Sequence, residues 1–377
     1  MEKIIFRKFL YDFVSFFLIV SLSISLIVWI IQSVNYLDFI SKDGHGFKVY
    51  FAFITLNFPK IFSKVIIFSY FISMFYIIQK YQTNNEILIF WTNGIGKLRL
   101  INFILKISII FLIFQLFLVY IIVPKLQNYS RDFIRTSNID LFSSLITEKK
   151  FIDTVKDFTI FVENIDENGN MENIYLKDSI DKFNSQIISA KNGSIIEKGK
   201  DKYLNLKFGY ILDIENNNFN RAKIIKFNNT IFNLSNLKSK TTTFPKIQEL
   251  NSNILFSCVK NFFYGEKENY VLPFFNCSEE SSIKSAKELF DRTIKQIYIL
   301  VLGMVASFLI LINKTNPKNN LYKVLILFSG LIFLIFSELN SEFISLRLLK
   351  NMVWMFLPLL FLISSYLLIS NLNKKII

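Results

Sequence analysis

The apolar positions of this chain fall into two blocks that a long polar segment separates. Three apolar runs lie within residues 13–123 and three more lie within residues 294–370. Each run comes close to the roughly 20 residues that a helix needs to cross a bilayer. The pattern also predicts a long second span, because the apolar stretch Val49–Phe58 leads into the second run through Pro59. The six runs are Phe13–Ser33, Ile61–Ile78, Leu100–Val123, Ile294–Ile312, Leu321–Phe336 and Met352–Ser370.

The polar segment alternates in the way that half-buried β-strands do. Phe158, Ile160 and Val162 share one face of a strand, and Asn168-Gly169 is a typical hairpin turn. Further short strands are predicted at residues 173–177, 187–190, 194–196, 203–208, 222–227 and 230–234. Short strands separated by turns in this way are typical of a sandwich or jelly roll. No long helix is predicted in this segment before Ser281–Gln296.

The fold class predicted from these patterns is a polytopic α-helical membrane protein with an inserted β-jelly-roll-like domain. Residues 1–124 hold transmembrane helices one to three, residues 125–290 hold the β-domain, and residues 291–377 hold helices four to six. We expect the first run to be a retained helix, because no small-residue cleavage site follows it before Asn35.

Charge sets the expected orientation in the membrane. The 377 residues carry a formal net charge of +14, and 52% of them are hydrophobic. The basic residues gather at the ends and in alternate loops, which by the positive-inside rule are cytoplasmic. The loop with Glu338 and Glu342 is then external, as is the large domain, and both termini are cytoplasmic. The residues that carry this argument are Lys3, Arg7, Lys8, Lys80, Lys97, Arg99, Lys314, Lys318, Lys323, Lys374 and Lys375.

Little in the chain points to catalysis or to a cofactor. Gly94-Ile95-Gly96-Lys97 lacks the upstream glycine and the Ser or Thr of a phosphate loop, so we expect no nucleotide site. His45 has no thiol or carboxylate neighbour that would make it a metal ligand. We expect no enzyme activity, no metal and no nucleic-acid partner. Cys258 and Cys277 both lie in the external segment, which leaves open both a disulfide and two free thiols.

The loop after the second span predicts a short helix at about residues 83–94. Thr83 or Asn84 is the expected cap, and Gly94 is the expected helix-ending residue. Glu86 falls near the N-terminus, and the apolar residues Ile87, Phe90 and Trp91 share a face. Such a helix either docks on a partner or lies in the headgroup layer of the membrane.

The same loop resembles a known family, the permease subunits of the lipopolysaccharide exporter (LptF/LptG). Asn85-Glu86-Ile87 followed by Gly94-Ile95-Gly96 is similar to the family's loop, with Gly96 where Ser is usual. Residues 158–162, 168–169 and 173–176 resemble the first hairpin of its periplasmic jelly roll. The resemblance extends over the full chain. Residues 29–38 favour the F-type subunit, although Asn35 stands where Arg is expected.

The resemblance implies a permease subunit of an ABC transporter that extracts lipopolysaccharide from the outer leaflet of the inner membrane. The implied partners are a paralogous permease subunit, a cytoplasmic ATPase dimer that hydrolyses the ATP, and single-span and periplasmic bridge proteins with jelly-roll domains. The implied ATPase-coupling residues are Asn85, Glu86, Ile87, Phe90, Trp91 and Gly94. The expected lipid groove is lined by Phe158, Ile160, Val162, Leu204, Leu206 and Phe208. The candidates for lipid phosphate are Lys42, Lys48, Lys60 and Lys64.

A different class of protein fits the same layout. A membrane sensor or assembly factor would also carry a partner-binding external β-domain, and would need no polar residues in its spans. Carriers of small polar solutes normally bury charges mid-membrane, and here only Lys64, Lys106 and Gln115 are candidates. A lipid extractor has no such requirement, because its cargo is itself apolar.

Overall fold

The computed structural model consists of two compact units, and each is described by itself. The first is Met1–Ile31, Leu56–Tyr129 and Phe244–Ile377, and the second is Gln32–Thr55 and Ser130–Thr243. The structure describes residues 2–37, 47–136, 148–155, 158–166, 169–179, 184–198, 201–215, 223–233, 245–264, 271–272, 275–312, 317–344 and 348–376.

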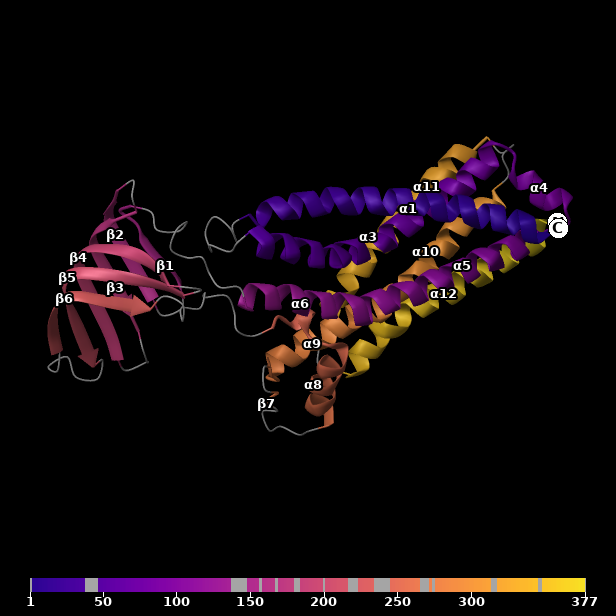
Figure 1. The fold of residues 1–377 in the computed structure, drawn as a ribbon. Coiled ribbons are helices and arrows are strands. Elements are labelled where there is room, and N and C mark those ends of the chain that lie inside the picture. Colours follow the sequence, from indigo (N-terminus) through magenta and orange to yellow (C-terminus); the bar gives the residue numbers. More distant parts are fainter. Residues whose placement is uncertain are drawn as a thin grey trace. The chain divides into compact units, whose positions relative to one another are not determined.

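The helices confirm the predicted order along the chain, with three spans before the β-strands and three after them (Figure 1). Among the residues that the structure describes, six helices are long and apolar enough to cross a membrane: Glu2–Asn35, Phe47–Thr83, Lys97–Ile134, Glu279–Leu311, Asn319–Phe343 and Asn351–Asn371. They are built from α1 (Glu2–Asn35), α3 (Phe47–Thr83), α5 (Lys97–Phe117), η1 (Leu118–Ile122), α6 (Val123–Thr136), α9 (Glu279–Arg292), η3 (Ile294–Ile297), α10 (Tyr298–Ser307), η4 (Phe308–Leu311), α11 (Asn319–Asn340), η5 (Ser341–Phe343) and α12 (Leu348–Ile376).

Two spans form the centre of the bundle. In the most apolar 18-residue stretch of each span, 67% of the residues of the second span and 72% of those of the fourth are buried, against 11% in the sixth. Small and polar residues allow the close contacts that packing in lipid requires. The hydroxyls of Tyr70 and Ser108 lie 2.6 Å apart between α3 and α5. On α11, Gly330 receives the ring of Phe71, which a methyl group at that position would overlap.

The third span and the segment after the β-domain differ from the prediction. The helix that begins at Lys97 continues through a π-helical turn, η1, to Thr136, beyond residue 125 where the β-domain was expected to start. A helix that was not predicted, α8 (Ser252–Tyr264), lies in the supposed β-region. Its sequence carried the signal, because Ile254, Leu255 and Cys258 recur at helical spacing.

Cys258 of α8 is joined to Cys277 by a disulfide, which closes the alternative of two free thiols. The bridge connects α8 to the start of α9, across the short strands β7 (Val271–Leu272) and β8 (Phe275–Asn276). Ser278 then caps α9 by accepting a hydrogen bond from the amide of Ser281.

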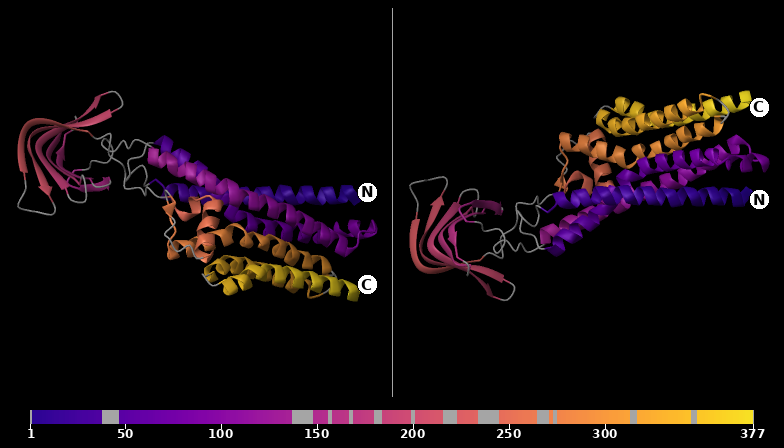
Figure 2. Two further views of the ribbon diagram at one scale, coloured as in Figure 1. Left: turned by 90° about the horizontal axis from the view of Figure 1, so that it is seen from below. Right: turned by 90° about the horizontal axis from the view of Figure 1, so that it is seen from above.

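The β-domain of the second unit is one antiparallel sheet in which each strand pairs with the next along the chain. Figure 2 shows the sheet as a deep curve. The ring of Phe158 stacks on that of Phe232 at 5.5 Å, so the strands near the two edges approach each other across the concave face. The strands are β1 (Phe151–Val155), β2 (Phe158–Ile165), β3 (Met171–Asp178), β4 (Asn184–Lys198), β5 (Asp201–Glu215) and β6 (Lys223–Asn233).

A transverse bend in the sheet changes which face the side chains point to. In β5, Leu204 and Leu206 are buried, but Phe208 adopts a left-handed φ of 55° and is 59% exposed. Asn173 in β3 is also left-handed, with φ of 49°. Asn173 and Phe208 lie in the same row of residues across the neighbouring strands. Beyond that row side chains again alternate between the two faces, but each position of the alternation points to the opposite face. Such irregularities increase the local bend of a sheet.

Candidate functional site

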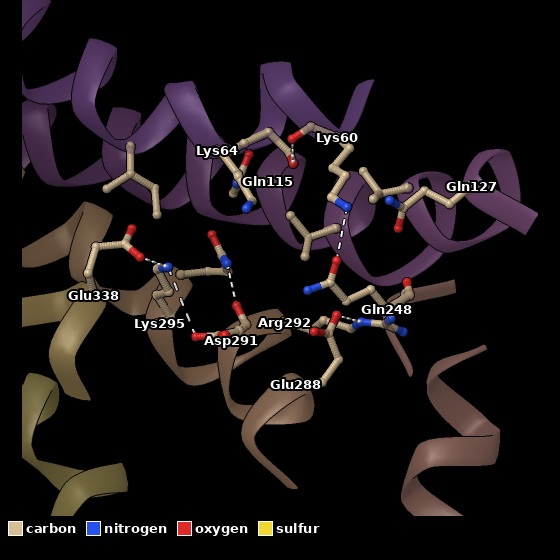
Figure 3. Close-up of a pocket in the computed structure, with 15 residues that line it drawn as sticks. Lys60, Lys64, Gln115, Gln127, Gln248, Glu288, Asp291, Arg292, Lys295 and Glu338 are labelled. Atoms are coloured by element: carbon tan, nitrogen blue, oxygen red, sulfur yellow. Dashed lines mark hydrogen bonds and ion pairs between the residues drawn. The ribbon is translucent and has the colours of Figure 1, made fainter. Parts of the chain in front are cut away.

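The first unit contains a polar pocket in an otherwise apolar bundle (Figure 3). It lies between α3, the continuous α5–η1–α6 helix and the α9–η3 segment, and has a volume of about 190 Å³. Its charged lining residues come from segments far apart in the sequence and comprise Lys60, Lys64, Glu288, Asp291, Arg292, Lys295 and Glu338.

The acidic residues of the pocket are held by bases on the α9–η3 side. The Nε of Arg292 donates to Glu288 at 2.9 Å. The Nζ of Lys295 donates to Glu338 at 2.6 Å and lies 4.0 Å from a carboxylate oxygen of Asp291. Two basic residues therefore serve three carboxylates here, and Asp291 is the least closely paired of the three.

The α3 wall keeps its positive charge. The Nζ of Lys60 donates to the amide oxygen of Gln248 at 2.9 Å, which is a neutral partner. Lys64 is exposed and makes no ion pair with the residues that the structure describes. An anion entering the pocket would thus meet two lysines one helical turn apart without competing carboxylates on the same helix.

Arg292 also fixes the segment that returns from the β-domain. Its Nη1 donates to the carbonyl of Leu250 and the hydroxyl of Ser252, and its Nη2 donates to the carbonyl of Gln248, each at 2.9 Å. Gln248 in turn faces Lys60, so the guanidinium positions one partner of the α3 lysine. A buried charge is tolerated only when its hydrogen bonds are satisfied in this way.

The four predicted phosphate candidates do not gather in one place. Lys60 and Lys64 line the pocket. Lys48 is exposed on the part of α3 that belongs to the second unit, and Lys42 lies outside the described residues. The sequence reasoning missed Arg292 and Lys295. Together with Glu288 and Asp291 they recur at helical spacing around the start of the fourth apolar run, a signal that the sequence carries.

The predicted short helix in the loop after α3 is present as α4 (Ile87–Thr92), shorter than the expected 83–94. Gly94 ends it with φ of 77°, as predicted. The amide of Gly94 donates to the carbonyl of Trp91 and that of Ile95 to the carbonyl of Phe90, at 3.0 and 2.9 Å, which is a Schellman motif. The expected cap, Thr83 or Asn84, is wrong, because Glu86 occupies the N-cap position without a side-chain cap hydrogen bond. The Thr83 hydroxyl donates to the carbonyl of Gln79 within α3, and the Asn84 amide donates to the carboxylate of Glu86.

The apolar face of α4 points into the bundle rather than outward. Phe90 is 1% exposed, and its ring lies 5.9 Å from that of Phe6 in α1. Ile87 and Trp91 are half-buried against the same core. The expectation that these three residues form an exposed docking face is therefore wrong for Phe90. The outward apolar residues are Leu88 and Ile89, which are 52% and 48% exposed.

The concave face of the sheet carries five of the six residues predicted to face inward. Phe158, Ile160, Val162, Leu204 and Leu206 are buried in one apolar cluster. Phe208 is the exception and a correction, since the bend turns it to the opposite face. A strict period of two could not locate this irregularity.

Six apolar helices with an antiparallel β-domain inserted after the third define a multi-pass membrane protein with one large domain. The sequence profile of the family described as lipopolysaccharide export system permease LptF/LptG matches residues 7–373. The chain belongs to this family. The profile does not separate the F type from the G type.

A bacterial protein is similar to part of this chain. The uncharacterized protein RP871 of Rickettsia prowazekii (strain Madrid E) is 22% identical over 242 residues. The match covers 63% of this chain and 66% of that protein, which is just under two thirds of the relative's length.

Proposed function

We propose that this chain is a permease subunit of an ABC transporter that takes lipopolysaccharide from the outer leaflet of the inner membrane and passes it to a periplasmic bridge. The single observation that carries the proposal is the family match over residues 7–373, which includes all six spans and the β-domain. The partners follow from the same membership: a paralogous permease subunit, a cytoplasmic ATPase dimer, and bridge proteins with jelly-roll domains.

The placement of ion pairs supports the proposed grouping of the loops on the two sides of the membrane. Glu338 and Glu342, assigned to the periplasmic side, pair with Lys295 and Lys287 of the segment that follows the β-domain. At the proposed cytoplasmic side, Arg99 pairs with Glu2 at 2.7 Å. Residues assigned to one side by charge are thus in contact with each other, as a bilayer requires.

The pocket supports a role in holding the lipid headgroup. Lys60 and Lys64 lack carboxylate partners among the described residues, and charge-assisted hydrogen bonds to phosphate are stronger than neutral ones. The buried concave face of the sheet supports a role for Phe158, Ile160, Val162, Leu204 and Leu206 in receiving acyl chains.

The α4 loop supports coupling to the ATPase in a revised form. Asn85, Glu86 and Gly94 set the shape of the loop, and Phe90 with Ile87 and Trp91 holds the helix on the bundle. Leu88 and Ile89 then form the surface that meets the ATPase.

Depletion of the chain in its native cells tests the proposal. Lipopolysaccharide should accumulate in the inner membrane, and purification of the tagged chain should bring down an ATPase and a paralogous permease. Replacing Lys60 and Lys64 together by Ala should reduce export at unchanged complex yield. The control is Lys284→Ala, which also replaces an exposed lysine by Ala but lies outside the pocket and should leave export unchanged. If depletion leaves lipopolysaccharide export unchanged, the sensor or assembly role becomes the better account.

A further inference from the structure

The convex face of the sheet holds a cavity that the proposed transport path does not use. Its volume is about 550 Å³, within the usual range of small-molecule sites. Five aromatic residues from β2 to β6 line it, and one of them, Phe227, also packs against the cluster of the concave face. The other four and the two basic residues are Phe161, Tyr175, Phe208, Tyr210, Lys191 and Lys226.

The bend of the sheet creates this cavity. Because alternation changes phase at the row of Asn173 and Phe208, two neighbouring rows of side chains face the same side. Phe208 is held there in a left-handed conformation that bulky residues rarely adopt. Backbone strain of this kind persists only where the surrounding structure enforces it, and it is frequent at ligand sites.

The aromatic rings of this face are unusually open. Phe208 and Tyr210 are 59% and 49% exposed, and the ring of Phe151 extends the patch by packing 4.6 Å from that of Phe161. Exposed apolar surface of this kind is a mark of an interaction site.

The charge on the cavity is positive and available. Lys191 and Lys226 make no ion pair with any residue that the structure describes. The neighbouring carboxylate of Glu163 accepts a hydrogen bond from the neutral amide of Asn173 at 2.6 Å and keeps its charge, but the two lysines outnumber it. An anionic ligand would therefore find two cations beside the rings.

The combination selects one class of ligand. Acyl chains would not use the lysines, or the amides of Asn173 and Asn228 that also line the cavity, and a lone phosphate would not use four rings. Sugar rings present C–H faces that pack on aromatic side chains and hydroxyls that bond to amides. Phosphate or carboxylate groups on the sugar would meet the lysines.

We propose that this convex cavity binds an acidic saccharide. The source to which we commit, the sugar portion of lipopolysaccharide, rests on the proposed function. The site would hold that portion of the cargo by contacts separate from those of the concave face.

Titration of the full-length chain in detergent tests the proposal directly. The probe is the phosphorylated core oligosaccharide, freed of lipid by mild acid hydrolysis, and binding is measured by calorimetry. Lys191→Ala with Lys226→Ala should weaken binding at least tenfold, and so should Tyr210→Ala, whereas Tyr210→Phe should keep most of it. The control pair Lys177→Ala with Lys207→Ala removes two exposed lysines outside the cavity and should change binding less than twofold. Dephosphorylated oligosaccharide should bind at least tenfold more weakly than the probe, and inorganic phosphate should not compete.

Three results would overturn the inference. The unmodified chain binds no oligosaccharide at millimolar concentration, or the control pair loses as much binding as the cavity pair, or a photo-crosslinker at Tyr210 captures only polypeptide in cells. Depletion of the chain separates this inference from the proposed function. If depletion stops lipid export while the oligosaccharide fails to bind, only the saccharide site falls. If the oligosaccharide binds while depletion leaves export unchanged, the transport role falls and the site stands.

Discussion

The guanidinium of Arg292 belongs to the largest fully buried side chain among the described residues, and four groups accept its hydrogen bonds. Removing one member of a buried ion pair costs about 3–5 kcal/mol, because the other charge stays buried and unpaired. We expect Arg292→Ala to lower the free energy of unfolding by this amount. Arg292→Lys should recover only part of it, since one ammonium cannot reach acceptors that a planar fork reaches.

Denaturant unfolding of the purified chain in detergent measures this loss. Lys284→Ala is the matched control, because its ion pair with Glu280 is exposed to solvent and its removal should leave the unfolding midpoint nearly unchanged. Equal midpoints for Arg292→Ala and Lys284→Ala would contradict the role assigned to the buried guanidinium.

Leu206 and Phe208 show how far residue-level prediction extends in the sheet. Period two placed Phe158, Ile160, Val162, Leu204 and Leu206 on one face, and the structure bears this out. Phe208 departs because the bend depends on backbone conformation in neighbouring strands, which no pattern in β5 alone reveals.

The same two residues give a test of the lipid path. A photo-crosslinking amino acid at Leu206 should capture lipopolysaccharide acyl chains during export, whereas one at Phe208 should not. Mass spectrometry of the crosslinked products checks this. Acyl-chain crosslinks of equal yield at both positions would mean that the concave face is not the lipid path.

At the scale of elements, one face of the helix α4 packs against the bundle, and the opposite face is exposed and available to bind the ATPase. Phe90 lies in the core, so Phe90→Ala should cost about 3–5 kcal/mol of stability. Leu88 and Ile89 point outward, so replacing both by Ala should weaken ATPase binding and leave the unfolding midpoint of the chain alone unchanged. Co-purification with the ATPase and thermal unfolding of the isolated chain separate the two effects. Unaltered ATPase binding in the double variant would instead favour α4 as an interfacial helix.

The elements that the sequence predicted well are those with a strong local signal. Six apolar runs of membrane-spanning length gave six helices, and the alternation of residues 158–162 gave β2. The end of α4 was also predicted, because Gly94 suits the left-handed residue that ends a helix. The side of α4 that faces the bundle was not, because Phe90 packs against Phe6 and Tyr81, and its own neighbours in sequence do not encode those contacts.

At the scale of the whole molecule, the polar pocket is the feature that the sequence least revealed. Lys60 and Gln248 are 188 positions apart, and their contact exists only because the return from the β-domain lies against α3. Charged side chains of α3, α9, η3 and α11 line the pocket together. The hydrophobic periodicity of the sequence predicts the helix to which each of them belongs, but not which side chains of other helices they contact. Long-range polar sites of this kind require the tertiary structure.

The disulfide of α8 offers an internal test of the orientation of the whole chain. Cys258 and Cys277 are 19 positions apart, and α8 precedes the fourth span on the side proposed to be periplasmic. Disulfides form and persist in the periplasm and are rare in the cytoplasm. In native membranes we therefore expect both thiols to resist a maleimide until a reductant is added.

Cys258→Ser should then expose Cys277 to a membrane-impermeant maleimide in cells whose outer membrane has been opened. Consecutive spans cross the membrane in opposite directions, so the loops between them lie alternately on its two sides. The same orientation therefore places a reporter at residue 95 or 318 in the cytoplasm. Two outcomes would contradict the proposed orientation and with it the proposed direction of lipid transfer. One is labelling of Cys258 and Cys277 without reductant, and the other is labelling of Cys277 only after the inner membrane has been opened.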